Sequence, residues 1–182
     1  MKVLVLTDRF QVPDGRTLVD VVRAAVDGGA DTVVLREKDL PRAERTALAI
    51  QLAAFVPTLI VASDPTIRGD GVHLGAGDPF PDRRPVRVGR SCHSPAELEQ
   101  AAAEGCDYAT LSPIFPSPSK PGYGPPLGLD ALRDAPLPVY ALGGIDASNA
   151  AACVTAGAAG VAVMSYVMRA ADPARAVSEL LS

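Results

Sequence analysis

Short runs of aliphatic and β-branched residues alternate with longer alanine-rich segments along almost the whole chain. Eight runs are candidate strands, at residues 2–6, 32–35, 58–61, 71–74, 86–89, 108–111, 139–142 and 160–163. Segments of helical period lie near residues 17–28, 41–54, 95–104, 127–133, 146–156 and 173–181. This alternation is typical of βα units around a parallel sheet. Eight strands within 182 residues therefore predict an α/β protein with a small (β/α)8 TIM barrel, forming one domain over residues 1–182.

A weak internal repeat supports this interpretation, although a doubly wound parallel sheet would show the same repeat. Gly29, Gly105 and Gly157 each stand between a helical segment and the next strand, where a helix C-terminus often needs a positive φ. The third unit departs from the repeat, because only the nine residues 62–70 join two parallel strands. A crossover with its own helix needs roughly 10–12 residues. We therefore expect the helix between strands 3 and 4 to be missing or reduced, leaving an edge that a homodimer would cover.

Composition limits the classes of partner. The net charge of −4 argues against nucleic acid or an anionic membrane as the main partner, so an anionic ligand requires a local cluster of positive groups. The first apolar run ends before Asp8 and is too short for a signal peptide core or a membrane span. The three cysteines, Cys92, Cys106 and Cys153, lack metal-ligand spacing. We interpret them as reduced thiols in a cytoplasmic protein.

Polar residues follow nearly every candidate strand, at the barrel end where βα loops converge and barrel enzymes carry their chemistry. In strand order these are Asp8 and Arg9; Arg36, Glu37 and Lys38; Ser63 and Asp64; Gly75 and Asp78; Ser91 and His93; the run 112–126; Gly143 and Gly144; and Met164 and Ser165. This distribution predicts a polar site on that rim.

The Gly143-Gly144 pair predicts a phosphate site. It follows the seventh strand and precedes Asp146, which stands where the next helix would be capped. Barrels commonly bind phosphate through backbone N–H groups of the loops after strands seven and eight, which here include Met164 and Ser165. A tight turn is the simpler explanation of the pair, but its position favours phosphate binding.

Ser117, Ser119 and Lys120 stand between prolines in the run FPSPSKPGYG. Proline restricts the backbone, so two hydroxyls and an ammonium group would be presented at low entropic cost to a second phosphate or a diphosphate. A solvated proline-rich surface loop is the alternative interpretation.

Two carboxylates follow neighbouring strands, Asp64 after the third and Asp78 after the fourth. They are candidates to share one Mg²⁺, which prefers carboxylates together with phosphate oxygens. Turn capping is the alternative. Arg36 and Lys38 alternate with Glu37, so we expect both cations to face one side, either toward a ligand or within a salt-bridged layer.

The two histidines differ in setting. His93, beside Ser91 at a strand end, is a candidate general acid or base near neutral pH. His73 lies inside the short run GVHLG, and we expect it to be packed in the structure. Cys92, between Ser91 and His93, is expected to face the core.

These same residues carry a family resemblance. The motifs TDR, LREKDL, SD with DGVHLG, GRSCHS, SPIFPSPSKP, ALGGI and GVAVMS occur in this order over nearly the whole chain. Together they resemble the thiamine phosphate synthase/TenI family, which also includes thiazole tautomerases.

For a synthase, the resemblance implies a transferase of thiamine biosynthesis. Such an enzyme couples hydroxymethylpyrimidine diphosphate with thiazole phosphate to give thiamine phosphate and diphosphate. Asp64 and Asp78 would hold Mg²⁺, Ser117 would lie near the pyrimidine, and Gly144 with the backbone around Ser165 would bind the thiazole phosphate. The departing diphosphate would be stabilised by Arg36, Lys38, Ser91, Ser119 and Lys120.

Three positions depart from the family's synthases. Val34 and Ala76 stand where the resemblance implies glutamine, and Ser63 stands where it implies asparagine. Lost amide contacts leave two alternatives open. One is a TenI-type thiazole tautomerase, an isomerase in which His93 shuttles a proton and no cofactor is needed. The other is a non-catalytic phosphate-binding barrel. The retained aspartates and the Ser-x-Ser-Lys run favour diphosphate chemistry.

Overall fold

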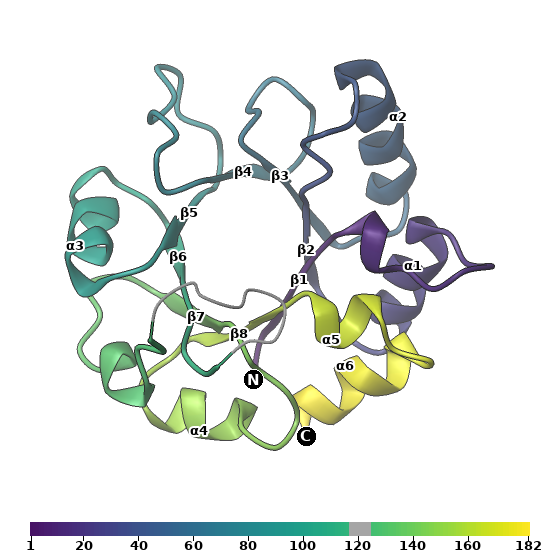
Figure 1. Cartoon of the computed structure of the whole chain (residues 1–182). Helices are drawn as coiled ribbons and strands as arrows, with labels where there is room; N and C mark the ends of the chain where they lie inside the picture. Colours follow the sequence, from purple (N-terminus) through teal and green to yellow (C-terminus); the bar gives the residue numbers. More distant parts are fainter. Residues whose placement is uncertain (117–124) are drawn as a thin grey trace.

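The protein forms a closed barrel of eight parallel strands, seen along its axis in Figure 1. The computed structural model describes residues 1–116 and 125–182. The strands are β1 (Val3–Leu6), β2 (Thr32–Leu35), β3 (Thr58–Ala62), β4 (Gly71–Leu74), β5 (Val88–Cys92), β6 (Tyr108–Leu111), β7 (Val139–Leu142) and β8 (Gly160–Val163). They pair in chain order, and β8 closes the ring on β1 with Val3 opposite Val161. The predicted (β/α)8 barrel is confirmed.

Helices surround most of the ring. They are α1 (Leu18–Asp27), α2 (Arg42–Ala53), α3 (Pro95–Ala103), α4 (Ala150–Thr155), α5 (Ser165–Met168) and α6 (Pro173–Leu181), with 3₁₀ turns η1 (Arg9–Gln11) and η2 (Leu129–Leu132). The predicted starts of α3 and α6 are confirmed, because Ser94 and Asp172 accept hydrogen bonds from the first turns. Among the described residues, no helix is long and apolar enough to cross a membrane.

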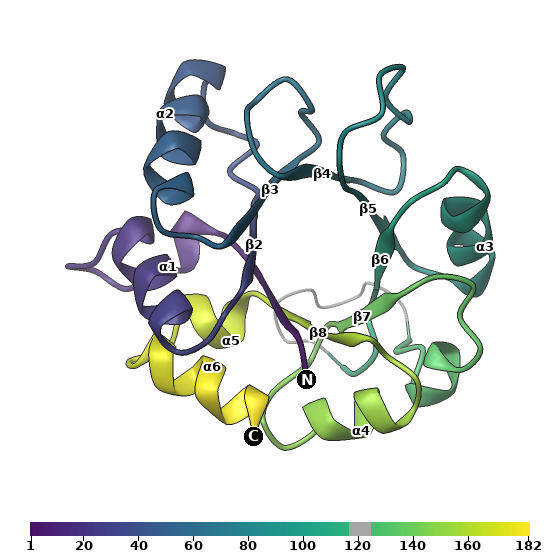
Figure 2. The ribbon, with the colours of Figure 1, turned by 180° about the vertical axis from the view of Figure 1, so that it is seen from behind.

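One side of the ring lacks helices. The described residues 63–70 between β3 and β4 contain no helix, as the short connection predicts. A second gap was not expected: residues 75–87 between β4 and β5 also form only loop, and Pro79, Pro81 and Pro85 interrupt this segment. Loops take the place of helices beside β3, β4 and β5 in both views (Figures 1 and 2). A homodimer on this side stays a prediction, as does the cytoplasmic location.

The largest error in the predicted strands concerns the fifth. β5 begins at Val88 rather than Val86, because Val86 follows Pro85 and is 91% exposed. The strand continues to Cys92, which pairs in register with Leu111 of β6. Ser91 therefore lies within the strand rather than after it. β1 likewise begins at Val3 instead of residue 2.

Two predicted helices are also shorter than expected. The segment near 127–133 forms only the 3₁₀ turn η2, which is followed by a positive φ of 52° at Asp134. The segment near 146–156 becomes helical only at Ala150. Asp146 does not cap α4 as expected, since its carboxylate accepts from the backbone N–H and hydroxyl of Ser148 in the preceding turn.

Side chains along each strand alternate between the barrel interior and the helical layer. In β1, Val3 and Val5 pack outward in the large cluster beneath the helices, whereas Leu4 and Leu6 point inward. The interior cluster comprises Leu4, Leu6, Val34, Ile60, Ala62, Tyr108 and Ala162. The same alternation carries Cys92 outward, where it is fully buried, and all three cysteines are free thiols, as predicted.

Gly89 makes room for an aromatic ring in the barrel interior. A Cβ atom at this position would lie 2.1 Å from Cζ of Tyr108. The Tyr108 ring also packs edge-on against Tyr140, with ring centroids 5.6 Å apart. Glycine at this inward position of β5 is therefore required by the large side chain of β6.

We predict that Gly89→Ala destabilises the protein, because the new methyl group displaces the buried Tyr108 ring. The expected loss in the free energy of unfolding is about 1–3 kcal/mol, measured by urea denaturation. Gly77→Ala is the matched control, since its Cβ would meet nothing within 4 Å. Equal stability of the two variants would contradict this account of the interior.

Candidate active site

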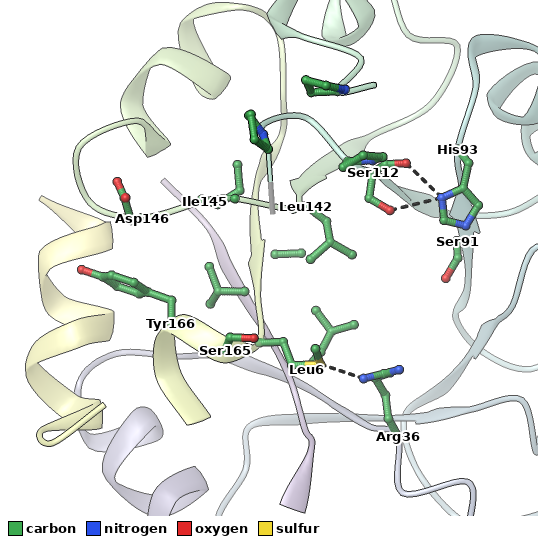
Figure 3. A pocket seen from close by; sticks show the side chains of 18 of the residues that line it. Leu6, Arg36, Ser91, His93, Ser112, Leu142, Ile145, Asp146, Ser165 and Tyr166 are labelled. Carbon is green, nitrogen blue, oxygen red and sulfur yellow. Dashed lines mark hydrogen bonds between the residues drawn. The ribbon is translucent and has the colours of Figure 1, made fainter. Parts of the chain in front are cut away.

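A cavity of about 810 Å³ opens where the carboxyl ends of the strands meet. Its volume lies within the usual range for small-molecule sites. The structure brings seven of the predicted site residues to its lining, namely Arg36, Ser91, His93, Gly143, Gly144, Met164 and Ser165. In Figure 3, Arg36, Ser91 and His93 lie on one side of this pocket, and Asp146 and Tyr166 lie on the other.

Arg36 supplies positive charge to the pocket wall. Its guanidinium donates to Sδ of Met164 at 2.7 Å (Figure 3), and it makes no ion pair with any acid in the described chain. Glu37, between Arg36 and Lys38, is instead buried and accepts from the guanidinium of Arg9 at 3.1 Å. Of this strand end, Glu37 therefore takes part in a salt bridge, as the second interpretation of the motif expected. Arg36 does not, so its positive charge is available to an anionic ligand.

Lys38 acts on the same region but does not line the cavity. It is exposed, and its charge contributes to lowering the pKa values of both His73 and Asp78. Arg36 also lowers the pKa of His73. The charges of both residues therefore reach the β4 side of the rim, but only Arg36 lines the cavity. That the two side chains face one side stays a prediction.

His73 lies one layer below the pocket, inside the barrel. It is 4% exposed, with Nδ1 3.1 Å from Oη of Tyr108 and Nε2 3.0 Å from Oγ of Ser91. Burial, reinforced by the charges of Lys38 and Arg36, lowers the pKa of His73 to about 3. The expectation of a packed histidine is confirmed, and the ring stays neutral at physiological pH.

His93 is held at the rim by the end of β6. Its Nδ1 atom lies 2.9 Å from the carbonyl oxygen of Ser112 and 3.3 Å from the Ser112 hydroxyl (Figure 3). Its backbone N–H donates to the carboxylate of Glu97 at 2.8 Å, which ties the loop to α3. The imidazole is thus oriented at the wall of the cavity, as a proton-transfer group requires.

The Gly143-Gly144 pair is explained first by close packing. Both residues have positive φ, 92° and 66°. A Cβ at Gly143 would lie 2.9 Å from Cα of Pro113, and one at Gly144 would lie 2.5 Å from the carbonyl oxygen of Pro116. Within residues 1–116 and 125–182, no hydrogen-bond acceptor meets the backbone N–H of Gly144 or Ser165. The glycine pair thus forms a tight turn, and the same loops also present backbone N–H donors of the kind that bind phosphate.

Asp64 and Asp78 lie beside the pocket and do not line it. The hydroxyl of Ser63 and the N–H of Gly75 both donate to Oδ2 of Asp78, while Asp64 accepts from Thr66. Partial burial raises each pKa, but these hydrogen bonds and nearby cations outweigh it and lower the pKa of both carboxyls. Both carboxylates cap turns, and both are ionised at neutral pH.

Asp64 and Asp78 could hold Mg²⁺ only together with ligands from a substrate or water. No group of three or more acidic, histidine or cysteine side chains suited to a metal occurs among the described residues. Mg²⁺ is commonly bound by one or two carboxylates together with substrate phosphates and water. Asp64 and Asp78 follow the neighbouring strands β3 and β4; Asp78 accepts from Ser63, whereas Asp64 pairs with Arg42 at 3.5 Å.

Arg90 is a residue that motif reading missed. Its guanidinium donates to the carbonyl oxygens of Gly75, Ala76 and Asp78 at 2.9–3.2 Å, and pairs with Glu104 at 2.7 Å. It therefore fixes the β4–β5 loop that carries Asp78. A charged side chain at an outward, buried position of a strand needs a compensating partner, and this requirement was the sequence feature that pointed to Arg90.

Three predicted residues lie outside the described residues: Ser117, Ser119 and Lys120. Two polar side chains that the sequence analysis did not single out also line the cavity, namely Tyr166 and Arg169. Arg169 follows the short helix α5, which no sequence pattern indicated. The rim therefore carries a second positive side chain on the β8 side.

Comparisons with known proteins identify the family of this chain. Residues 3–167 match the family model described as thiamine monophosphate synthase. The chain is 41% identical to a thiamine-phosphate synthase of Roseiflexus castenholzii, covering 98% of this chain and 86% of the relative. For the corresponding protein of Methanoculleus marisnigri the identity is 39%, with 97% and 92% covered. The chain belongs to the thiamine monophosphate synthase family.

A solved structure of this family has the same architecture. Thiamine phosphate pyrophosphorylase from Pyrococcus furiosus is 29% identical, with a TM-score of 0.80, and the match covers 99% of this chain and 93% of that one. The family resemblance seen in the motifs is thereby confirmed.

The positions that depart from the family's synthase pattern have distinct surroundings. Val34 is fully buried in the interior cluster, and Ala76 lines the cavity. Ser63 has a φ of 61°, a left-handed conformation that asparagine adopts more readily than serine. Its hydroxyl donates to Oδ2 of Asp78, so serine at this position helps to hold that carboxylate in place.

We predict that His73 makes stability fall in acid. Between the unfolded pKa of about 6.5 and the native value of about 3, the unfolded chain binds a proton that the native protein does not. The free energy of unfolding therefore rises with pH in this window. Wild type should lose about 2 kcal/mol more than His73→Gln between about pH 7 and about pH 5, measured by urea unfolding. The same pH dependence in both proteins would contradict it, because all other titrating groups are shared.

Proposed function

We propose that this protein is a thiamine-phosphate synthase, a transferase that joins hydroxymethylpyrimidine diphosphate to thiazole phosphate. Family membership over nearly the full length supports the reaction. The observation that carries the placement of substrates is Arg36, a cation on the cavity wall with no acidic partner among the described residues. A diphosphate leaving group requires this kind of charge at the reacting end of the pocket.

The diphosphate occupies the side of the pocket formed by β2, β4 and β5. Arg36 and Ser91 border the cavity there, and Lys38 adds positive charge at the same rim. Ser119 and Lys120 are assigned to the same group by the resemblance alone. As the bond between the pyrimidine methylene carbon and the diphosphate oxygen breaks, both electrons leave with the oxygen. These donors stabilise the negative charge that accumulates.

Asp64 and Asp78 would hold Mg²⁺ on this side of the pocket. Their lowered pKa values keep both carboxylates anionic, and Arg90 fixes the loop of Asp78. When bound, Mg²⁺ supplies further positive charge to the diphosphate oxygens.

The thiazole phosphate occupies the opposite side of the pocket. The backbone N–H groups of Gly144 and Ser165 lie at the ends of β7 and β8, where barrels commonly bind phosphate. The thiazole nitrogen then donates its lone pair to the pyrimidine methylene cation and forms the new C–N bond. Ser117 is assigned to the pyrimidine by the resemblance alone.

The thiazole tautomerase is the second candidate, and the orientation of His93 by Ser112 is the observation that favours it. It requires neither Mg²⁺ nor diphosphate. Incubation with both synthase substrates separates the candidates: thiamine phosphate formation that EDTA abolishes supports the synthase. No product, with turnover of the thiazole carboxylate tautomer instead, would establish the isomerase.

We predict that Asp78→Asn lowers kcat/KM for thiamine phosphate formation by roughly a hundred-fold, because the neutral amide keeps the turn but loses the charge that Mg²⁺ requires. The loss should lessen as the Mg²⁺ concentration is raised. Asp82→Asn, in the same loop and exposed, is the matched control with near wild-type rates. Equal activity of Asp78→Asn and Asp82→Asn would remove Asp78 from the site.

A further inference from the structure

We propose that Tyr108 and His73 form a hydrogen-bond relay that fixes the direction of the Ser91 hydroxyl, so that Ser91 donates its hydrogen to an anion in the pocket. Tyr108 and His73 are positioning residues in this relay, because neither lines the cavity, whereas Ser91 does. The nature of the anion, a diphosphate, rests on the proposed function. The relay itself rests on the contacts inside the barrel.

The geometry of three adjacent strands builds the relay. His73 of β4, Gly89 of β5 and Tyr108 of β6 are paired in register. Because Gly89 has no side chain, the Tyr108 ring crosses above it and reaches Nδ1 of His73 at 3.1 Å. Ser91 follows Gly89 on the same inward face and meets Nε2 of His73 at 3.0 Å. The relay therefore runs from the barrel interior to the pocket wall.

The direction of each hydrogen bond follows from counting donors. Tyr108 is buried, and its hydroxyl has no hydrogen-bond partner in the described residues besides Nδ1 of His73. If Nδ1 carried the imidazole hydrogen, the Tyr108 hydroxyl would have to accept it, and its own hydrogen would be left buried and unpaired. With the hydrogen on Nε2, Tyr108 donates to Nδ1 and Nε2–H donates to Ser91.

The consequence is a fixed role for Ser91. The contact with His73 is the one hydrogen bond of its hydroxyl among the described residues. Since that bond uses a lone pair of Oγ, the hydroxyl hydrogen remains for the pocket. Burial and the charges of Lys38 and Arg36 keep the ring neutral, so the pattern persists over the physiological pH range. A phosphate oxygen in the pocket therefore meets the hydroxyl hydrogen of Ser91 rather than a lone pair of its oxygen.

The direct test reads the tautomer without any turnover. The chain has two histidines, so a ¹⁵N-histidine sample gives two pairs of ring-nitrogen signals, and His93→Gln assigns each pair to its residue. Long-range ¹H–¹⁵N correlation spectra at about pH 7 should show a protonated Nε2 and a bare Nδ1 for His73. A protonated Nδ1 would overturn the relay. Because this readout needs no substrate, its failure is distinct from failure of the proposed reaction.

Tyr108→Phe tests the first link, because phenylalanine keeps the ring above Gly89 and removes only the hydroxyl. The variant should lose the single tautomer and show both forms of His73 in the same spectra. An unchanged spectrum would show that Tyr108 does not set the tautomer, and would overturn the relay as stated.

A double-mutant cycle tests the link to the pocket, with inorganic diphosphate and Mg²⁺ as the probe in isothermal titration calorimetry. Ser91→Ala and His73→Leu should each weaken diphosphate binding by roughly ten-fold. The double variant should bind no more weakly than Ser91→Ala, because His73 acts through Ser91. His73→Gln, which keeps a donor and an acceptor, should restore much of the affinity. Losses that multiply would show a structural role instead.

Two controls keep the cycle interpretable. Thermal unfolding checks that each variant is folded, and Tyr108→Phe combined with Ser91→Ala replaces the cycle if His73→Leu does not fold. Wild-type protein that binds no diphosphate would contradict the proposed function, while the histidine spectra would still decide the relay.

Discussion

Closure of the parallel sheet into a ring is the constraint on which the rest of the structure depends. Once β8 pairs with β1, every strand has its carboxyl end on one rim and its side chains divided between interior and exterior. Groups that are far apart in the chain, such as Arg36 and Met164, then contact each other on the wall of a single pocket. The helices contribute the outer hydrophobic layer. The ring nevertheless closes although loops replace the helices between β3 and β4 and between β4 and β5.

The barrel interior is where packing and chemistry meet. Most inward side chains are aliphatic, yet the segment beneath Ser91 contains a histidine and a tyrosine that need partners. Gly89 provides the space in which these two side chains satisfy each other. The same arrangement places a neutral, buried histidine ring directly below the pocket. Stability in acid and the direction of the Ser91 hydroxyl thus depend on one cluster.

Much of the fold was predictable because its signals are local. Short runs of aliphatic and β-branched residues marked eight strands, and Gly29, Gly105 and Gly157 have the positive φ values expected at helix ends. The end of β5 was not predictable, because its continuation to Cys92 depends on pairing with β6. Position after a strand placed Arg36 and His93 at the pocket. The contacts of Arg90 and Tyr108 depend on the positions of neighbouring strands, which no local pattern contains.

The central claim is that one pocket holds two anionic groups on opposite sides. The most direct measurement is a crystal structure of the protein with thiamine phosphate, diphosphate and Mg²⁺. The account predicts diphosphate against Arg36 and Ser91, and the phosphate of thiamine phosphate on the backbone N–H groups of Gly144 and Ser165. Density for diphosphate away from Arg36, or for the phosphate outside the β7–β8 loops, would contradict it.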